Sequence, residues 1–209
     1  MPPPSIQKLI ELFSKLPGVG PRQASRFAYY LLKDQNGLAS DLALTISEAK
    51  NKTTLCGICF RTIEKDINKK PMCNLCSNDK RDQTAIAVVE KESDMHNLEK
   101  TGVHYGLYHV LGGIISPLDA ESPKKIRIKE LFERVKNSLE TSQKAEVVLA
   151  TSATTEGDTT ALYIERVLMV FKDKHPGFKI SRLGRGLSLG SELEYADETT
   201  LKNAFLNRK

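Results

Sequence analysis

The stretch LATSATTEGD, residues 149–158, decides the fold of most of this chain. It follows the apolar residues Val147 and Val148 and leads into TTALYIERVLMVF, whose apolar residues have helical spacing. A strand, a turn and the start of a helix in this order are typical of α/β domains, which bind phosphates and metals at such junctions. A metal-dependent enzyme would carry carboxylates at the strand tip. Here the tip carries hydroxyls instead, on Thr151, Ser152, Thr154 and Thr155.

Strands and helices alternate on both sides of this junction. Apolar runs predict strands at Ala85–Val89, Leu107–Leu111, Val147–Thr151 and Phe178–Leu183. Amphipathic stretches between them predict helices at roughly Asp94–Lys100, Arg127–Leu139 and Thr159–Phe171. Alternation of this kind predicts a parallel, doubly wound sheet, and the fold class is therefore multi-domain α/β.

The first 50 residues have a different, helical pattern. Ser5 is suited to cap a first helix whose apolar residues recur every three or four positions up to Leu16. The segment PGVGP, residues 17–21, breaks that helix, and Pro21 suits the first turn of a second helix. A third helix is predicted at roughly Leu38–Lys50. This part of the chain is thus a small helical unit.

All four cysteines lie between these two parts. Cys56, Cys59, Cys73 and Cys76 form two C-x₂-C pairs separated by 13 residues. Each pair lets one tight turn present two sulfurs to one ion, and two turns complete the tetrahedral shell that structural Zn²⁺ prefers. The absence of a secretory leader argues against disulfides, and a redox motif needs only one pair. An iron–sulfur cluster remains the minor alternative.

The excess positive charge lies in the first 80 residues, which hold 12 Lys and Arg against 7 Asp and Glu, while the remainder is neutral. Around the helical hairpin, Gly18 and Gly20 allow close approach of the backbone to a phosphate. Arg22 and Arg26 share one face of the second helix. The hairpin is either a sequence-independent DNA-binding element or only a tight helical corner with exposed arginines.

No apolar run approaches the roughly 18 residues that a membrane span requires. The N-terminal MPPPS contains no apolar region of the kind found in a signal peptide. We therefore expect a cytoplasmic, nucleoid-associated protein with no membrane partner.

Several segments together resemble the RecR family of bacterial recombination proteins, from about Ser5 to the last helix. They are LPGVGPRQASRFAYYLL, LCGIC with MCNLC, VVEKESDMHNLEKTG, GLYHVLGGIISPLDA, EVVLATSATTEGDTTALYIERVL and RGLSLGSELEYADETTL. The resemblance implies a helix-hairpin-helix unit at 1–54, a C4 zinc finger at 55–80, a Toprim domain at 81–176 and a C-terminal swapped tail at 177–209.

The family resemblance also bears on the hydroxyl-rich junction. Catalytic Toprim proteins carry a glutamate after the first strand and an Asp-x-Asp pair after a later one, which hold Mg²⁺. Glu90 matches the first acid, but Ser152-Ala153-Thr154 replaces the pair. Glu156 and Asp158 match the acids that follow. We expect a retained fold without the chemistry, and Mg²⁺ binding that is weak or absent.

The chain departs from the family pattern in three places. Most relatives carry Asn-Pro at Ser152-Ala153 and Pro at Ser188, and the spacer between the cysteine pairs is longer here. The tail segment ELEYADE resembles a Walker B-like region, but no phosphate-binding loop precedes it.

The resemblance implies a non-catalytic DNA-binding clamp or adaptor in recombinational repair. It would act with RecO and RecF to load the recombinase onto gapped DNA, as a homodimer or homotetramer joined through its terminal regions. One alternative is a Mg²⁺-dependent nuclease or primase-type enzyme using Glu90, Glu156 and Asp158. Another is a zinc-dependent assembly module without DNA contact.

Overall fold

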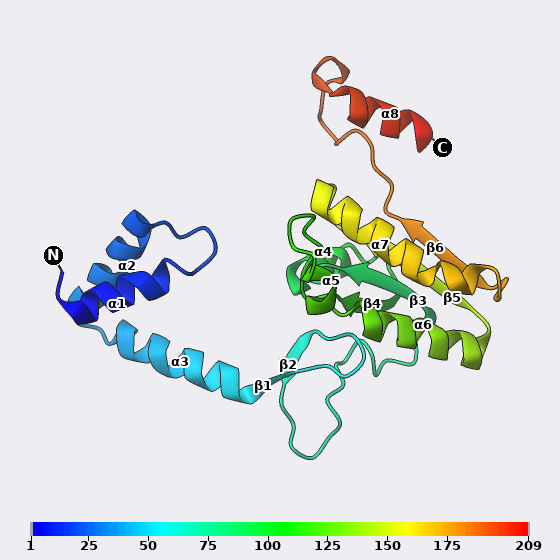
Figure 1. Ribbon diagram of the computed structural model, residues 1–209. Coiled ribbons are helices and arrows are strands. Elements are labelled where there is room, and N and C mark those ends of the chain that lie inside the picture. The colour runs from blue at the N-terminus through cyan, green and yellow to red at the C-terminus, as the bar shows by residue number, and fades with distance from the viewer. Residues whose placement is uncertain (1, 209) are drawn as a thin grey trace. The chain divides into compact units, whose positions relative to one another are not determined.

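The computed structural model describes residues 2–208, which form two compact units that divide after Thr53 (Figure 1). The first unit contains three helices: α1 (Pro4–Phe13), α2 (Pro21–Lys33) and α3 (Leu38–Lys52). Helix α1 begins one residue before Ser5 and has Pro3 at its N-cap position, so the prediction that Ser5 caps this helix is wrong. Proline suits this entry because the first helical positions need no N–H donor.

The hairpin between α1 and α2 is held by two aromatic rings and by small side chains. Phe13 and Phe27 meet edge to face with 6.1 Å between centroids, and Ala24 and Ala28 are fully buried. Pro21 occupies the first turn of α2, as predicted. Helix α3 is different, because within the described chain none of its side chains is buried.

The second unit is built on a four-stranded parallel sheet in the order β4-β3-β5-β6, which confirms the doubly wound fold class. The strands are β3 (Asp82–Val89), β4 (Gly106–Val110), β5 (Ala145–Ala150) and β6 (Phe178–Arg182). Helices α4 (Glu92–Thr101), α6 (Ile128–Ser142) and α7 (Thr155–Lys172) connect them, with a short α5 (Ser122–Lys125) before α6.

The two faces of this sheet bury alternate residues of the strands. Helices α6 and α7 lie side by side over one face, against Ile86, Val88, Val147 and Leu149 (Figure 1). Met95 of α4 packs on the other face, against Ala87, Val89, Tyr108, Val110 and Ala150. The chain places β4 on one side of β3 and β5 on the other side, so the strand order reverses at β3. The carboxyl ends of β3 and β5 lie at this reversal, which is where α/β folds bind ligands.

The predicted α7 is confirmed but begins four residues earlier than expected, because Thr154 caps it. The Thr154 hydroxyl accepts a hydrogen bond from the Gly157 N–H at 3.1 Å. The hydroxyl-rich strand tip is therefore partly a helix cap.

Two further segments complete this unit. A two-stranded sheet of β1 (Thr53–Leu55) and β2 (Thr62–Glu64) precedes the main sheet and flanks the first cysteine pair. After β6 the chain continues through a short 3₁₀ helix, η1 (Leu193–Tyr195), to α8 (Glu198–Leu206).

Candidate functional site

The first cysteine pair lies in a tight turn, the first knuckle, between β1 and β2. The Cys56 N–H donates to the Arg61 carbonyl at 2.8 Å, and the Phe60 N–H donates to the Cys56 carbonyl at 3.0 Å. Phe60 has a φ of 63°, a left-handed conformation uncommon for a residue with a side chain. These contacts turn the backbone so that Cys56 and Cys59 point to the same place.

The second pair completes a closed cluster of four buried sulfurs. All four Sγ atoms lie within 4.8 Å of one another, and those of Cys59 and Cys73 are 3.5 Å apart. Tetrahedral coordination at the usual Zn–S distance places sulfurs about 3.8 Å apart. Backbone N–H groups of Cys73 and Cys76 point at Sγ atoms of Cys56 and Cys73, both at 3.4 Å. The donor set therefore fits one metal ion and leaves no open position.

The thiols strongly perturb one another. Hydrogen bonds from Cys59, Cys73 and Cys76 lower the pKa of Cys56. The bond with Cys56 raises the pKa of Cys73, but those with Cys59 and Cys76 outweigh it and lower this pKa to about 6. Cys76 donates to its three neighbours, which raises its own pKa. Thiolates are the metal-binding form of cysteine, so a metal ion bound here would replace the protons of this cluster.

The cysteine cluster is joined to the parallel sheet by both apolar and polar contacts. Leu75 packs against the cysteines and also against the sheet residues next to α4. Glu92, at the start of α4, accepts a hydrogen bond from the Thr62 N–H at 2.7 Å. The Val110 N–H donates to the Cys59 carbonyl at 2.9 Å. The cysteine segment therefore folds onto the sheet.

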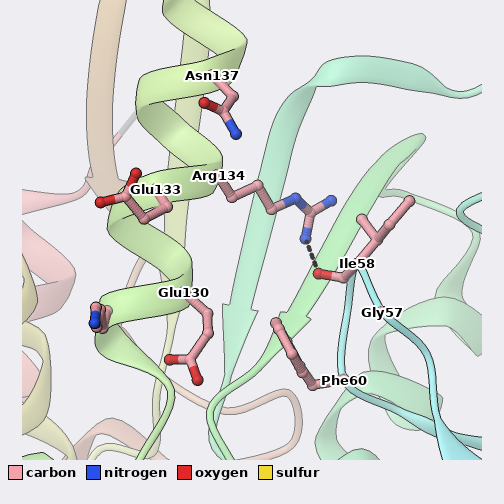
Figure 2. A pocket seen from close by; sticks show the side chains of 8 residues that line it. Gly57, Ile58, Phe60, Glu130, Glu133, Arg134 and Asn137 are labelled. Atoms are coloured by element: carbon pink, nitrogen blue, oxygen red, sulfur yellow. Dashed lines mark hydrogen bonds between the residues drawn. The ribbon is translucent and has the colours of Figure 1, made fainter.

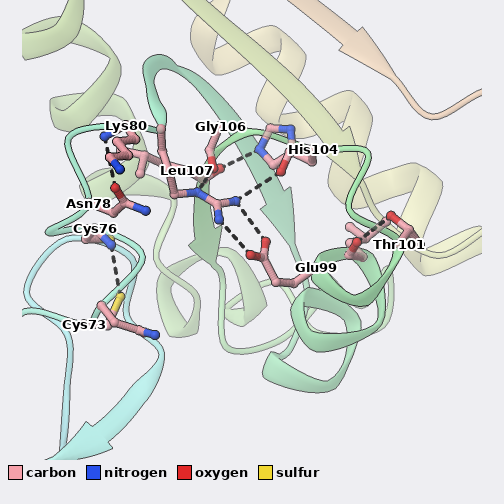
Figure 3. Close-up of polar contacts among 12 residues, drawn as sticks. Cys73, Cys76, Asn78, Lys80, Glu99, Thr101, His104, Gly106 and Leu107 are labelled. Atoms are coloured by element: carbon pink, nitrogen blue, oxygen red, sulfur yellow. Dashed lines mark hydrogen bonds and ion pairs between the residues drawn. The ribbon is translucent and has the colours of Figure 1, made fainter.

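Arg81 anchors the chain where it leaves the cysteine segment and enters β3. Its guanidinium forms two bonds to Glu99, at 2.7 and 2.9 Å, and its Nε donates to the Gly106 carbonyl at 2.8 Å. It also donates to the carbonyl of His104 at 3.1 Å, and Figure 3 shows the partners on α4 and before β4. This bidentate pair raises the pKa of Arg81 and lowers that of Glu99.

At the carboxyl end of β3, Glu90 is buried and has both of its carboxylate oxygens occupied by one residue. The Ser152 N–H donates to Oε1 at 2.8 Å, and the Ser152 hydroxyl donates to Oε2 at 2.9 Å. The close approach depends on Gly157, because a Cβ at this position would collide with the Ser152 carbonyl and lie 3.0 Å from Oε1. The junction thus forms a closed Glu90–Ser152 contact.

The other two acids of this junction do not join Glu90. Asp158 accepts two bonds from Arg185, one of them at 3.0 Å, and lies 3.5 Å from the Arg182 guanidinium. The Arg185 guanidinium lowers the pKa of Asp158. The Glu156 carboxylate is half-buried and has no hydrogen bond or ion pair within residues 2–208. In that same range the four cysteines are the only group of three or more acidic, histidine or cysteine side chains placed to share one ion.

The helical hairpin presents its predicted phosphate-binding residues to solvent. Gly18 has a φ of 77° and Gly20 is the N-cap of α2, and neither has an atom near the position of a Cβ. Arg22 and Arg26 are exposed, and neither makes an ion pair in the part of the chain that the structure describes. The backbone N–H groups at the start of α2 and the two guanidinium groups are therefore free to meet an anion.

Sequence reasoning missed three arginines that complete these sites: Arg134, Arg182 and Arg185. Each acts on a partner that is distant in the sequence, so spacing gave no signal for them. The only local sequence feature that could have drawn attention to one of them is the position of Arg185 next to the glycines of RGLSLG.

Comparison with known proteins agrees with this architecture. Family models match at residues 6–50 (RecR, helix-hairpin-helix), 84–184 (Toprim domain) and 186–209 (RecR, C-terminal). A protein named Recombination protein RecR from Moorella thermoacetica is 45% identical over 99% of this chain and 96% of its own length. Proteins of the same name from Streptococcus thermophilus and Streptococcus pyogenes serotype M49 are 42% and 41% identical, each over 99% of this chain and 97% of their own length. No helix within residues 2–208 is long and apolar enough to cross a membrane.

Proposed function

This chain belongs to the RecR family of recombination proteins, and from that premise we propose that it is a non-catalytic clamp that binds DNA through its helical hairpin. The observation that carries the proposal is the pair of exposed guanidinium groups on α2, which form no ion pair within residues 2–208, next to the N–H groups at the start of that helix. Gly18, Gly20, Arg22 and Arg26 would contact successive phosphates, which confers no sequence preference. RecO and RecF are the proposed partners in loading the recombinase onto gapped DNA.

The decisive experiment is the salt dependence of binding to gapped duplex DNA, followed by fluorescence anisotropy with and without RecO. Each lost phosphate contact should flatten the log–log salt slope by about 0.9. We expect weaker binding and a flatter slope for Arg22→Ala/Arg26→Ala. The control Lys69→Ala/Lys70→Ala removes the same charge from the cysteine segment and should behave like wild type. Identical slopes for all three proteins, in both series, would refute the hairpin as the DNA contact.

We propose that the Toprim domain does not cleave or relax DNA. Two of its three acids already have partners, Glu90 with Ser152 and Asp158 with Arg185, and within residues 2–208 these acids do not form a group of three placed to share one ion. Incubation of supercoiled plasmid with Mg²⁺ tests this. Cleavage or relaxation that disappears in Glu90→Gln would instead support the enzyme alternative.

We propose Zn²⁺ as the metal of the four cysteines. The buried tetrathiolate geometry suits an ion that needs no open coordination position. Elemental analysis should find one zinc per chain. Visible absorption together with iron and sulfide would identify the iron–sulfur alternative.

We further propose that copies of this chain associate through both terminal regions, in a dimer or tetramer. Helix α3 exposes Leu42, Leu44 and Ile46, and the tail exposes Tyr195 and Phe205. An apolar surface of this extent on small elements is typical of a protein interface. The boundaries 1–54, 55–80, 81–176 and 177–209 remain our proposed division, in which the last segment is exchanged between subunits.

A further inference from the structure

Arg134, on helix α6, reaches from the helix to the first cysteine knuckle. Its Nη1 donates to the Tyr108 carbonyl at 2.6 Å and to the Ile58 carbonyl at 3.3 Å. Figure 2 shows this side chain extended from α6 toward Ile58. Both residues line a cavity of about 530 Å³. Ile58 stands between the two cysteines of the first pair, so the guanidinium contacts the metal-binding turn itself.

The same contact completes the outer edge of the sheet. Strand β4 is an edge strand, paired only with β3 among the described strands. Its free N–H at Val110 donates to the Cys59 carbonyl, and its free carbonyl at Tyr108 accepts from Arg134. The knuckle and Arg134 together therefore satisfy groups that an edge strand otherwise exposes. Any displacement of the knuckle would therefore disturb the hydrogen bonds of both Val110 and Tyr108.

The charge of Arg134 is not paired with a carboxylate in the described part of the chain, although Glu130 and Glu133 line the same cavity. No ion pair involves its guanidinium within residues 2–208, and its Nη2 is enclosed without a hydrogen-bond partner. Glu130 and Glu133, on the same helix, are exposed. Burial lowers the pKa of Arg134, and the nearby cysteine thiolates act in the opposite direction. An enclosed cation is costly unless it is paired.

The metal site would supply the missing negative charge. Four thiolates around one Zn²⁺ carry a net charge of −2. Only a cation outside the four cysteines can offset this charge. We propose that Arg134 is the counter-cation of the metal centre, holding the first knuckle on β4 and slowing the release of the metal. This inference rests on the proposed zinc site. Partners outside the ligand shell commonly change metal affinity by roughly 10–100-fold.

Two substitutions separate charge from hydrogen bonding. Arg134→Gln keeps a donor but removes the charge, and Arg134→Lys keeps the charge but removes the planar fork. Lys136→Gln is the matched control, because it removes one positive charge from the same helix at an exposed position, where the side chain lies 4.0 Å from Glu140.

The measurement is the rate of zinc transfer from the full-length protein to a chromogenic chelator, with melting temperatures of the zinc-loaded and zinc-free forms. We expect Arg134→Gln to release zinc at least tenfold faster, Arg134→Lys to lie nearer wild type, and Lys136→Gln to match wild type. We also expect Arg134→Gln to narrow the melting-temperature gap between the two forms.

Two results would overturn the inference in distinguishable ways. A wild-type protein that takes up no zinc would remove the proposed metal and this role with it. A zinc-loaded wild type whose release rate is unchanged in Arg134→Gln, or changed equally in Lys136→Gln, would remove the role of Arg134 alone. If Arg134→Gln does not fold, a release rate for Arg134→Lys at least tenfold above that of Lys136→Gln would also count against the charge-based account.

Discussion

Ser152 donates two hydrogen bonds to Glu90, one from its N–H to Oε1 at 2.8 Å and one from its hydroxyl to Oε2 at 2.9 Å. The serine stands where catalytic Toprim domains carry an aspartate. A second carboxylate so near Glu90 would need a cation between the two, whereas a hydroxyl satisfies Glu90 directly. At this position a hydroxyl, and not a second carboxylate, therefore faces Glu90.

Ser152→Ala should lower the free energy of unfolding by about 1.5–3 kcal/mol, because it removes a hydrogen bond to a buried carboxylate. Urea denaturation at neutral pH measures the loss. Ser142→Ala is the control, since this exposed hydroxyl donates only to backbone carbonyls, including that of Ser138 at 2.7 Å. It should change stability by less than about 0.5 kcal/mol. Equal losses in the two variants would contradict the special role of the Glu90 contact.

The ion pair between Asp158 and Arg185 links α7 to the start of the tail. Asp158→Asn should loosen residues that follow Arg185, and trypsin should then cleave after Arg185 several-fold faster than in wild type. Glu165→Gln is the matched control, because it removes the partner of Arg182 at 2.6 Å and leaves Arg185 in place. Both carboxylates are partly exposed, so we expect small changes in global stability. Equal cleavage rates in all three proteins would exclude an anchoring role.

The parallel sheet could be predicted because each strand is a short apolar run bounded by turn residues. Amphipathic spacing also predicted α3, but it could not tell what covers the apolar face. Leu42 and Ile46 follow the expected pattern and yet remain 40% and 66% exposed. A pattern identifies an apolar face, whereas its partner depends on tertiary or quaternary contacts.

Arg134 shows a different limit of sequence reasoning. Its two carbonyl partners lie 76 and 26 positions away, at Ile58 and Tyr108. On its helix it looks like any polar residue beside an apolar face. Only the packing of α6 beside β4 and the knuckle reveals its contacts. Cysteine spacing, by contrast, correctly predicted the cluster of four sulfurs, because two residues between thiols already determine their local geometry.

His109 should make the stability of the protein depend on pH. Its ring is fully buried beside Phe60, its Nε2 lies 2.8 Å from the Arg127 carbonyl, and burial lowers its pKa from 6.5 to about 3. Between these values the unfolded state binds more protons, so stability is lost as the pH falls. His109→Gln lacks this penalty. The stability advantage of wild type over His109→Gln should therefore shrink by about 2 kcal/mol between pH 7 and pH 5.

Urea denaturation of both proteins at the two pH values measures this difference. Acid affects the cysteines of both proteins equally, so that effect cancels in the difference. The exposed His96 provides the control, and the difference between wild type and His96→Gln should change little over the same range. A wild-type advantage over His109→Gln that stays constant with pH would show that the buried ring is not held neutral.

The apolar face of α3 should be an interface between two copies of the chain. Leu42→Glu/Ile46→Glu places two charges on side chains that are already exposed in one chain, so the helical unit should still fold. At an interface the same charges would lose their water, and association should weaken by at least 100-fold. Light scattering after size exclusion should show a smaller assembly, and circular dichroism should show unchanged helix content. Ser40→Glu, an exposed position away from this face, should leave the mass unchanged. An unaltered mass for the double variant would mean that the chains associate elsewhere.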